Sequence, residues 1–258
     1  MQIPRNLFKA RLKAGEQQIG VWNCIGDSGV TELLAACGYD WIVIDTEHGP
    51  IEVRDALPML QAVAGYPGAS AVVRPAINDW VLIKRHLDQG AQTILVPYVQ
   101  SREEAEAAVR AMRYPPRGVR GVAGVTRATR FGEVEGYFTS AEDELCLLLQ
   151  VETKAALESL EDIATVEGVD GIFIGPADLA ASMGHPGDAG HPEVVAAIED
   201  AIARLKAIGV PSGILTLDPA FARRCILCGT TFTAVAVDTV TLAKGARALC
   251  EAVRPPAG

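Results

Sequence analysis

Eight short apolar runs alternate with helical patterns from one end of this 258-residue chain to the other. Most runs are rich in Val, Ile or Leu and bounded by Gly, Pro or Asp, as is typical of strands buried on both faces. They cover residues 19–23, 40–45, 70–74, 92–97, 145–152, 170–175, 210–215 and 232–237. Such a regular alternation predicts parallel strands joined by helical crossovers.

The segments between these runs carry helix signals. Ser101 and Glu104 have the spacing of a capping box. Pro192 and Gly209 stand near the start and just past the end of another helical pattern. Because no low-complexity linker divides the chain, the sequence predicts one α/β domain, a single (β/α)8 TIM barrel over residues 1–258.

A doubly wound open sheet is the competing architecture. It normally has fewer strands, and its nucleotide-binding version carries GxGxxG after the first strand. The stretch "VWNCIGDSG" does not supply that motif. The barrel is therefore favoured.

Charge and hydropathy exclude several classes of partner. A formal net charge of -9 argues against nucleic acid, which would require a basic surface. The N-terminus lacks the basic start, apolar core and cleavage site of a signal peptide. No window reaches the roughly 18 uninterrupted apolar residues of a membrane helix. We expect a soluble cytoplasmic protein with no nucleic-acid or membrane partner.

The six cysteines are expected to be reduced in that compartment. Cys225 and Cys228 form a CxxC, a spacing found in redox and zinc sites. The surrounding "FARRCILCGT" instead predicts a helix that ends at Gly229, and no second Cys or His pair has zinc spacing. No function is assigned to this pair.

Barrel active sites lie at the carboxyl ends of the strands, so the residues that end each run test the prediction of an enzyme. These positions hold Trp22, Asn23, Asp45, Glu47, His48, Arg74, Gln150, Glu152, Asp178, Leu215 and Asp238. The charged groups converge on one rim, which is more than strand termination requires. No role is assigned to Glu47, which is expected to face water.

Glu152 and Asp178 follow adjacent strands. Two carboxylates without a nearby thiolate suit a hard cation such as Mg²⁺ or Mn²⁺. A solvated strand end or a helix N-cap is the alternative, and Asp178 fits a cap. Against that alternative, the turn Gly175–Pro176–Ala177 in "IGPAD" offers backbone N–H groups for a substrate carboxylate.

Arg74 and His48 complete the constellation. Arg74 follows the apolar residues "AVV", and a guanidinium at the end of a buried strand needs an anionic partner. A substrate oxygen or a developing enolate ranks first and a structural salt bridge second. His48 fits a general base, although a lone His in a loop is more often only a hydrogen-bonding residue.

Two absences narrow the reaction type. A Schiff-base aldolase needs a lysine inside the barrel, but every lysine falls in a helix or a loop. Phosphate-binding barrels have Gly-rich turns after strands 7 and 8, where this chain has "LTLDP" and "VDTVT". A metal, an arginine and a histidine remain, which are the groups needed to stabilise an enolate.

Residues 115–138 break the regular alternation of strands and helices. They form a long Gly- and Arg-rich connection, "PPRGVRGVAGVTRATRFGEVEGYF". Since the loop leads from a helix back into a strand, it is expected on the amino-terminal face of the barrel. There it is far from its own active site. Service to a neighbouring subunit's site and a solvated loop are equally supported.

The chain resembles the HpcH/HpaI family of class II pyruvate aldolases, in its 4-hydroxy-2-oxoheptane-1,7-dioate aldolase branch. The matching stretches are "YDWIVIDTEHGP", "VVRPAINDW", "LDQGAQTILVPYVQ", "RYPPRGVRGV", "LLQVETKAAL" and "VEGVDGIFIGPADL". The resemblance implies the same barrel, assembled as a homohexamer whose C-terminal helices (about 239–253) are exchanged between subunits. It also implies that the Gly- and Arg-rich loop reaches a neighbouring site.

The resemblance also implies roles for individual residues. Glu152 and Asp178 would bind the divalent metal, Mg²⁺ or Mn²⁺, with Co²⁺ or Zn²⁺ as alternatives. Arg74 would stabilise the pyruvate enolate. His48, paired with Asp88 and supported by Asp45, would be the acid/base. The 2-oxo acid would be contacted by Gln150, Gly175, Pro176 and Ala177, and the pocket lined by Trp22 and Leu215.

The implied activity is that of a metal-dependent carbon–carbon lyase. It would cleave 4-hydroxy-2-oxo acids to pyruvate and an aldehyde and catalyse the reverse addition. A lyase similar to citrate lyase or malyl-CoA lyase is one alternative, and it would need basic residues at the mouth for CoA. A non-catalytic 2-oxo acid binding protein is the other.

Overall fold

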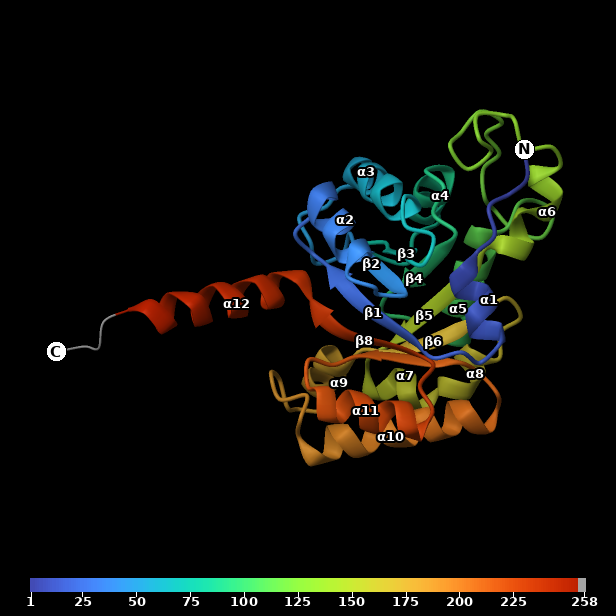
Figure 1. Cartoon of the computed structure of the whole chain (residues 1–258). Coiled ribbons are helices and arrows are strands. Elements are labelled where there is room, and N and C mark those ends of the chain that lie inside the picture. Colours follow the sequence, from blue (N-terminus) through green and yellow to red (C-terminus); the bar gives the residue numbers. More distant parts are fainter. Residues whose placement is uncertain (255–258) are drawn as a thin grey trace.

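The computed structural model describes residues 1–254 and shows a closed barrel of eight parallel strands in sequence order (Figure 1). The predicted (β/α)8 barrel is therefore confirmed, and the predicted strand ends agree with the structure within two residues. The strands are β1 (Gln18–Asn23), β2 (Trp41–Asp45), β3 (Ser70–Arg74), β4 (Thr93–Val96), β5 (Cys146–Val151), β6 (Gly171–Ile174), β7 (Ser212–Leu215) and β8 (Phe232–Val237).

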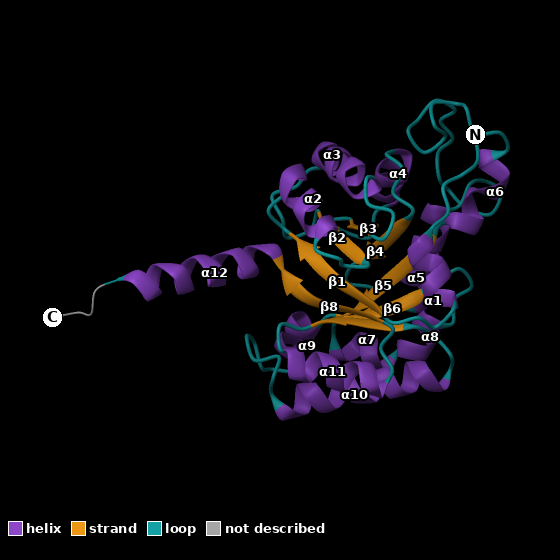
Figure 2. Cartoon of the chain, viewed as in Figure 1, coloured by secondary structure: helices purple, strands orange, loops and turns teal. Residues whose placement is uncertain are grey.

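Helices surround this barrel (Figure 2). They are α1 (Leu7–Lys13), α2 (Ser28–Ala36), α3 (Val53–Ala64), α4 (Trp80–Asp88), α5 (Arg102–Met112), α6 (Tyr137–Glu144), α7 (Lys154–Glu158), α8 (Leu160–Ala164), α9 (Pro176–Ser182), α10 (Pro192–Ala207), α11 (Pro219–Cys228) and α12 (Asp238–Val253). The start of α5 is as predicted, because Ser101 Oγ accepts a hydrogen bond from Glu104 N. The CxxC lies in the last turn of α11, before Gly229, as predicted.

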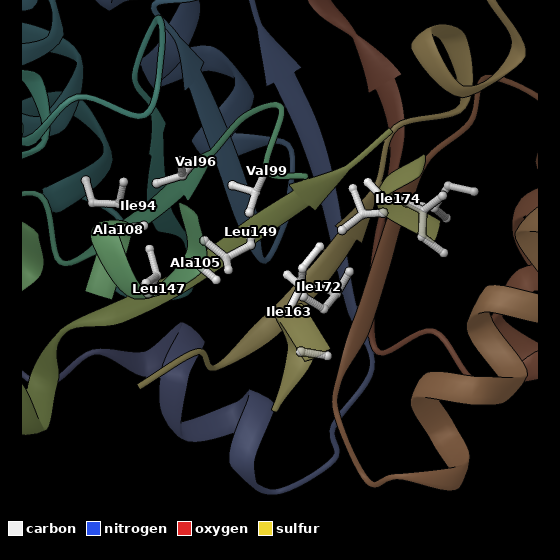
Figure 3. Packing of buried hydrophobic residues seen from close by; sticks show 14 of the residues in the cluster. Ile94, Val96, Val99, Ala105, Ala108, Leu147, Leu149, Ile163, Ile172 and Ile174 are labelled. Atoms are coloured by element: carbon white, nitrogen blue, oxygen red, sulfur yellow. The ribbon is translucent and has the colours of Figure 1, made fainter. Parts of the chain in front are cut away.

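The core has two layers because alternate strand residues point to opposite faces. Trp41 and Val43 belong to the cluster inside the barrel, which Phe8 of α1 joins at the amino-terminal end through contacts with Trp41 and Phe232. Ile42 and Ile44 point outward, toward the helices. Figure 3 shows the outer layer, where Ile94 and Leu149 lie near Ala105 and Ala108 of α5, and Ile172 lies near Ile163 of α8. Each fully buried Ile or Leu contributes about 1.5–3 kcal/mol.

The 115–138 segment lies on the amino-terminal face, as predicted. Arg120 Nη2 is 3.0 Å from Asp88 Oδ1, and Arg127 Nη1 donates to Gln89 O at 2.7 Å, so the segment is held against the C-terminal end of α4. Its irregular part ends at Gly136, where α6 begins. Neither α6 nor α1 was expected from the sequence.

Helix α12 extends away from the barrel on the side opposite this segment (Figure 1). Its apolar side chains are open to solvent: Leu242 is 65% exposed, Leu249 74% and Val253 83%. Asp238, at its first position, is buried and accepts hydrogen bonds from Cys24 N at 3.0 Å and Ile25 N at 2.9 Å. Among residues 1–254, no helix combines the length and apolarity needed to cross a membrane.

His86, on the buried face of α4, predicts a pH-dependent stability. Neither ring nitrogen has a hydrogen-bond partner, and burial, with a smaller effect of Arg85, lowers the pKa of His86 from 6.5 to about 4. Between these pH values the unfolded chain binds a proton that the folded chain rejects. Stability is therefore full above pH 6.5 and falls on acidification, by roughly 3 kcal/mol in all for this group.

The variant His86→Leu removes this group. Its free energy of unfolding should fall less than that of the parent between pH 7 and pH 4.5, measured by urea titration with circular dichroism. Parallel curves for the parent and His86→Leu would contradict the assignment.

Candidate active site

The centre of the site is a buried ion pair at the carboxyl end of the barrel. Arg74 is paired in register with Asp45 of the neighbouring strand. Its Nε donates to Asp45 Oδ1 at 2.9 Å and its Nη2 to Asp45 Oδ2 at 2.6 Å. Burial raises the pKa of Asp45, but the Arg74 hydrogen bonds and charge outweigh it, so the pKa lies below its usual value. Asp45 therefore stays ionised beside a fixed guanidinium.

Trp22 lies against this pair. The guanidinium carbon of Arg74 is 5.5 Å from the centroid of the Trp22 ring, and that ring also contacts Phe173 at 5.1 Å between centroids. The aromatic contact limits the positions open to Arg74. Leu215, at the end of β7, packs partly buried against the same inner cluster.

Glu47 does not face water as expected. Its Oε2 is 2.7 Å from Arg74 Nη1, and its side chain is 19% exposed. Burial and the charges of Asp45 and Asp178 raise the pKa of Glu47 despite the opposing effect of Arg74. Strand β2 ends at Asp45, so Glu47 lies in the turn that follows, where its N–H donates to Asp45 Oδ1 at 3.1 Å; the strand pattern therefore gave no signal for its position.

Glu152 lies next to the ion pair and is 2% exposed. Its Oε1 accepts from Tyr98 N at 2.8 Å and its Oε2 from Gln150 Nε2 at 2.5 Å. Burial raises the pKa of Glu152 to about 7; the Gln150 hydrogen bond opposes the rise and the charge of Asp178 adds to it. Within residues 1–254 no basic side chain forms an ion pair with Glu152. A buried carboxylate without an ion-pair partner is stabilised by a bound cation.

A divalent metal suits this pair of carboxylates. Asp178 is the third residue of α9 and is exposed, so Glu152 and Asp178 present oxygen ligands from the inside and the rim. Gly175 leaves room above Glu152, since a Cβ there would lie 2.5 Å from Glu152 Oε2. Gln150 Oε1 is buried without a partner, which leaves an acceptor for a bound molecule.

Only part of the turn at the start of α9 has free backbone N–H groups. Gly175 N is bonded to Val151 O at 3.1 Å, and Pro176 has no N–H. The N–H groups of Ala177 and Asp178 belong to the first helical turn and have no acceptor within the helix. These two groups are the donors that a substrate carboxylate could use.

His48 and Asp88 are not brought together within one chain. The His48 ring is 67% exposed at the carboxyl-end rim, where the nearest carboxylate atom is Glu47 Oε1 at 3.9 Å. Asp88 ends α4, which runs back to the amino-terminal face and holds Asp88 against Arg120. The contact between Asp45 and His48 is through the backbone: Asp45 Oδ1 accepts the N–H of His48 at 3.3 Å. The Asp45 carboxylate is also bound by Arg74.

The fold and the site together are those of a barrel whose carboxyl end holds two carboxylates, Glu152 and Asp178, beside a buried guanidinium. A guanidinium fixed in this way can stabilise negative charge that develops on an oxygen. In the described chain no strand carries a lysine, so the site has no amine for a Schiff base.

Comparison with known proteins identifies the family. Residues 18–245 match the family model described as HpcH/HpaI aldolase/citrate lyase. A pyruvate aldolase of Rhizobium etli is 64% identical over 249 residues, which are 96% of this chain and 98% of that protein. A 4-hydroxy-2-oxo-heptane-1,7-dioate aldolase of Klebsiella pneumoniae is 53% identical over 245 residues, 95% of this chain and 92% of that protein.

A solved structure agrees with these relatives. The crystal structure of an HpcH/HpaI aldolase/citrate lyase family protein from Burkholderia cenocepacia has a TM-score of 0.93 at 39% identity, covering 97% of this chain and 100% of that one. The chain belongs to the HpcH/HpaI aldolase/citrate lyase family. It is an aldolase, a carbon–carbon lyase of a metal-dependent family.

Proposed function

We propose that the enzyme cleaves 4-hydroxy-2-oxo acids to pyruvate and an aldehyde, and catalyses the reverse addition, with a Mg²⁺ or Mn²⁺ ion held by Glu152 and Asp178. The observation that carries the proposal is the buried Glu152 carboxylate, which lies beside Arg74 yet forms no ion pair in the described chain. A bound divalent ion supplies the Lewis acidity that stabilises developing negative charge.

The 2-oxo acid is oriented by neutral groups. Ala177 N–H and Asp178 N–H bind its carboxylate, and the Gln150 amide, fixed by Glu152, contacts the bound acid. Trp22 and Leu215 form the apolar wall. In the proposed arrangement the 2-oxo oxygen faces the guanidinium of Arg74.

Arg74 stabilises the enolate. Asp45 takes the Nε hydrogen and one Nη2 hydrogen, which leaves N–H groups on Nη1 and Nη2 for an anionic oxygen. Glu47 contacts Nη1 and holds the guanidinium from its other end. Since the group is already fixed, it needs no reorganisation when charge develops.

His48 moves the proton. It accepts the proton of the C4 hydroxyl while the C3–C4 bond breaks and the aldehyde carbonyl forms. The electron pair stays on the pyruvate enolate, and His48 returns the proton to C3. The exposed ring at the rim is accessible to both substrate and solvent.

Assembly completes the proposed site. Asp88 can pair with His48 only across a subunit boundary, because the two residues lie at opposite ends of one barrel. We propose a homohexamer in which the 115–138 segment of one subunit reaches a neighbouring site. Helix α12 extends away from the barrel (Figure 2), and its exposed apolar side chains support exchange of that helix between subunits.

Metal removal tests the proposal. Pyruvate release from a 4-hydroxy-2-oxo acid, coupled to lactate dehydrogenase, should fall roughly 100-fold or more after EDTA treatment and return with Mg²⁺ or Mn²⁺. Glu152→Gln should lose activity that no added metal restores. Full activity in EDTA-treated enzyme would exclude the proposed role of the metal.

A further inference from the structure

The loop that connects α9 to α10, residues 183–191, carries two histidines outside the proposed active site (Figure 1). The sequence repeats Gly-His-Pro here, at 184–186 and at 190–192. A proline restricts the residue before it to extended backbone, and His191 has a φ of -55° and a ψ of 136°. The repeat therefore places the same backbone restriction on both histidines.

Backbone hydrogen bonds fold this loop into consecutive turns. His185 N donates to Ala180 O at 2.8 Å, which ties the loop to α9. Asp188 N donates to His185 O at 3.0 Å, and His191 N donates to Asp188 O at 3.1 Å. Gly187 has a φ of 81°, the left-handed conformation that glycine adopts without steric cost. The backbone alone therefore brings His185 and His191 together.

The side chains of the two histidines and of Glu193 form one cluster. The two imidazole rings stack with their centroids 3.5 Å apart and their planes 14° from parallel. His185 Nε2 lies 3.1 Å from Glu193 Oε2, and one ligand atom from each of the three residues lies within 4.8 Å of the other two. Two ligands of a tetrahedral ion at about 2.1 Å are roughly 3.4 Å apart, so side-chain rotations bring all three to one ion.

The charges of the cluster suit a cation. The hydrogen bond with His185 and the charges of His185 and His191 lower the pKa of Glu193. No lysine or arginine of residues 1–254 forms an ion pair with this carboxylate. Glu193 lies in the first turn of α10, where it offsets the partial positive charge of the helix N-terminus. Two protonated rings at 3.5 Å repel each other, whereas two neutral rings can bind one ion.

We propose that His185, His191 and Glu193 bind a Zn²⁺ ion at a site separate from the Glu152 and Asp178 carboxylates. Imidazole nitrogen favours Zn²⁺, Ni²⁺ and Cu²⁺ over Mg²⁺, which prefers oxygen ligands. Three protein ligands leave a coordination position for water. The ion joins the loop after α9 to the first turn of α10. The inference is independent of the proposed function, because none of its three ligands belongs to the proposed active site.

The first test counts Zn²⁺ bound to metal-free enzyme by titration calorimetry. His185→Gln and His191→Asn should each bind one equivalent per chain fewer than the parent, and the lost site should have micromolar affinity. His191 Nδ1 accepts Glu193 N at 3.3 Å as the N-cap of α10, and asparagine also caps helices, so His191→Asn removes the ligand but keeps a cap. Loss of an equivalent in Glu152→Gln tests the proposed function instead.

The same titration separates the carboxylate ligand from the general charge of α10. Glu193→Gln should weaken Zn²⁺ binding at this site by roughly tenfold or more. Glu199→Gln is the matched control, since Glu199 lies on the same helix but pairs with Arg224. Its affinity for Zn²⁺ should equal that of the parent. Equal weakening in both variants would mean that only the charge of the helix attracts the ion, and would overturn the inference.

The second test identifies the ligands with Cu²⁺. With one equivalent of Cu²⁺ and excess Mg²⁺, the electron paramagnetic resonance spectrum should show coupling to two nitrogens, which an all-oxygen site does not give. His48→Gln, which removes the exposed histidine of the active-site rim, is the control and should keep this coupling. Two-nitrogen coupling that persists in His185→Gln overturns the inference, as does a parent in which the site binds Zn²⁺ only at millimolar concentration.

Discussion

Gly175→Ala is expected to reduce kcat/KM roughly 100-fold or more and to weaken Mn²⁺ binding measured by titration calorimetry. The added Cβ would lie 2.5 Å from Glu152 Oε2 and 2.7 Å from Glu152 Cβ, closer than such atoms approach in proteins. The carboxylate must therefore move from the position in which Tyr98 and Gln150 hold it.

The barrel itself should survive this change. The backbone of Gly175 has a φ of -94°, which alanine adopts without strain, so the cost is the steric one of about 1–3 kcal/mol. Gly68→Ala is the control, since a Cβ at that position has no heavy atom within 4 Å. Wild-type activity in Gly175→Ala at saturating metal would show that Glu152 is not a ligand.

Arg74→Met should lower the free energy of unfolding by about 3–5 kcal/mol at pH 7, because it leaves Asp45 and Glu47 buried without their cation. It should also lower kcat by roughly 100-fold or more, since the enolate loses its guanidinium. Urea unfolding followed by circular dichroism gives the first quantity, and the pyruvate assay gives the second.

The sign of the pH dependence follows from Asp45. In the parent its pKa lies below the usual value, so this group stabilises the fold above that value and the contribution is lost as pH falls. In Arg74→Met burial, the largest effect, raises the pKa of Asp45 and is opposed only by the backbone N–H groups of Glu47 and His48, so this pKa lies higher than in the parent. Acidification from pH 7 to pH 5 should therefore narrow the gap in stability between variant and parent.

A second substitution separates the two roles of Arg74. Arg74→Met combined with Asp45→Asn removes a buried charge and should regain much of the stability at pH 7. It should not regain turnover. Recovery of activity in the double variant would reduce Arg74 to a structural ion pair, which was the alternative from the sequence.

Much of the fold was predictable because each strand is an apolar run between turn residues. The active-site rim was predictable for the same reason, since the residue that ends each run lies at the carboxyl end. The partners of Arg74 were not predictable in this way. They depend on the register of β3 against β2, which places Arg74 opposite Asp45 and which no single run specifies.

The expected pairing of His48 with Asp88 shows the same limit. The resemblance implies that Asp88 lies beside His48. In the structure Asp88 ends α4 and therefore lies at the opposite end of its own barrel. The resemblance also implies a helix at about 239–253 that is exchanged between subunits. In the structure of residues 1–254 the apolar side chains Leu242, Leu249 and Val253 of this helix are exposed, so one chain does not show what they pack against.

The first residue of α12 gives that helix a second significance. Asp238 ties the root of α12 to the backbone of Cys24 and Ile25, and Cys24 Sγ in turn lies 3.5 Å from Asp45 Oδ2. If α12 is held by a neighbouring subunit, its docking also stabilises the segment at Cys24 and Ile25, which borders Asp45 and Arg74. The fraction of assembled enzyme rises with its total concentration, so the specific activity should rise with enzyme concentration as well.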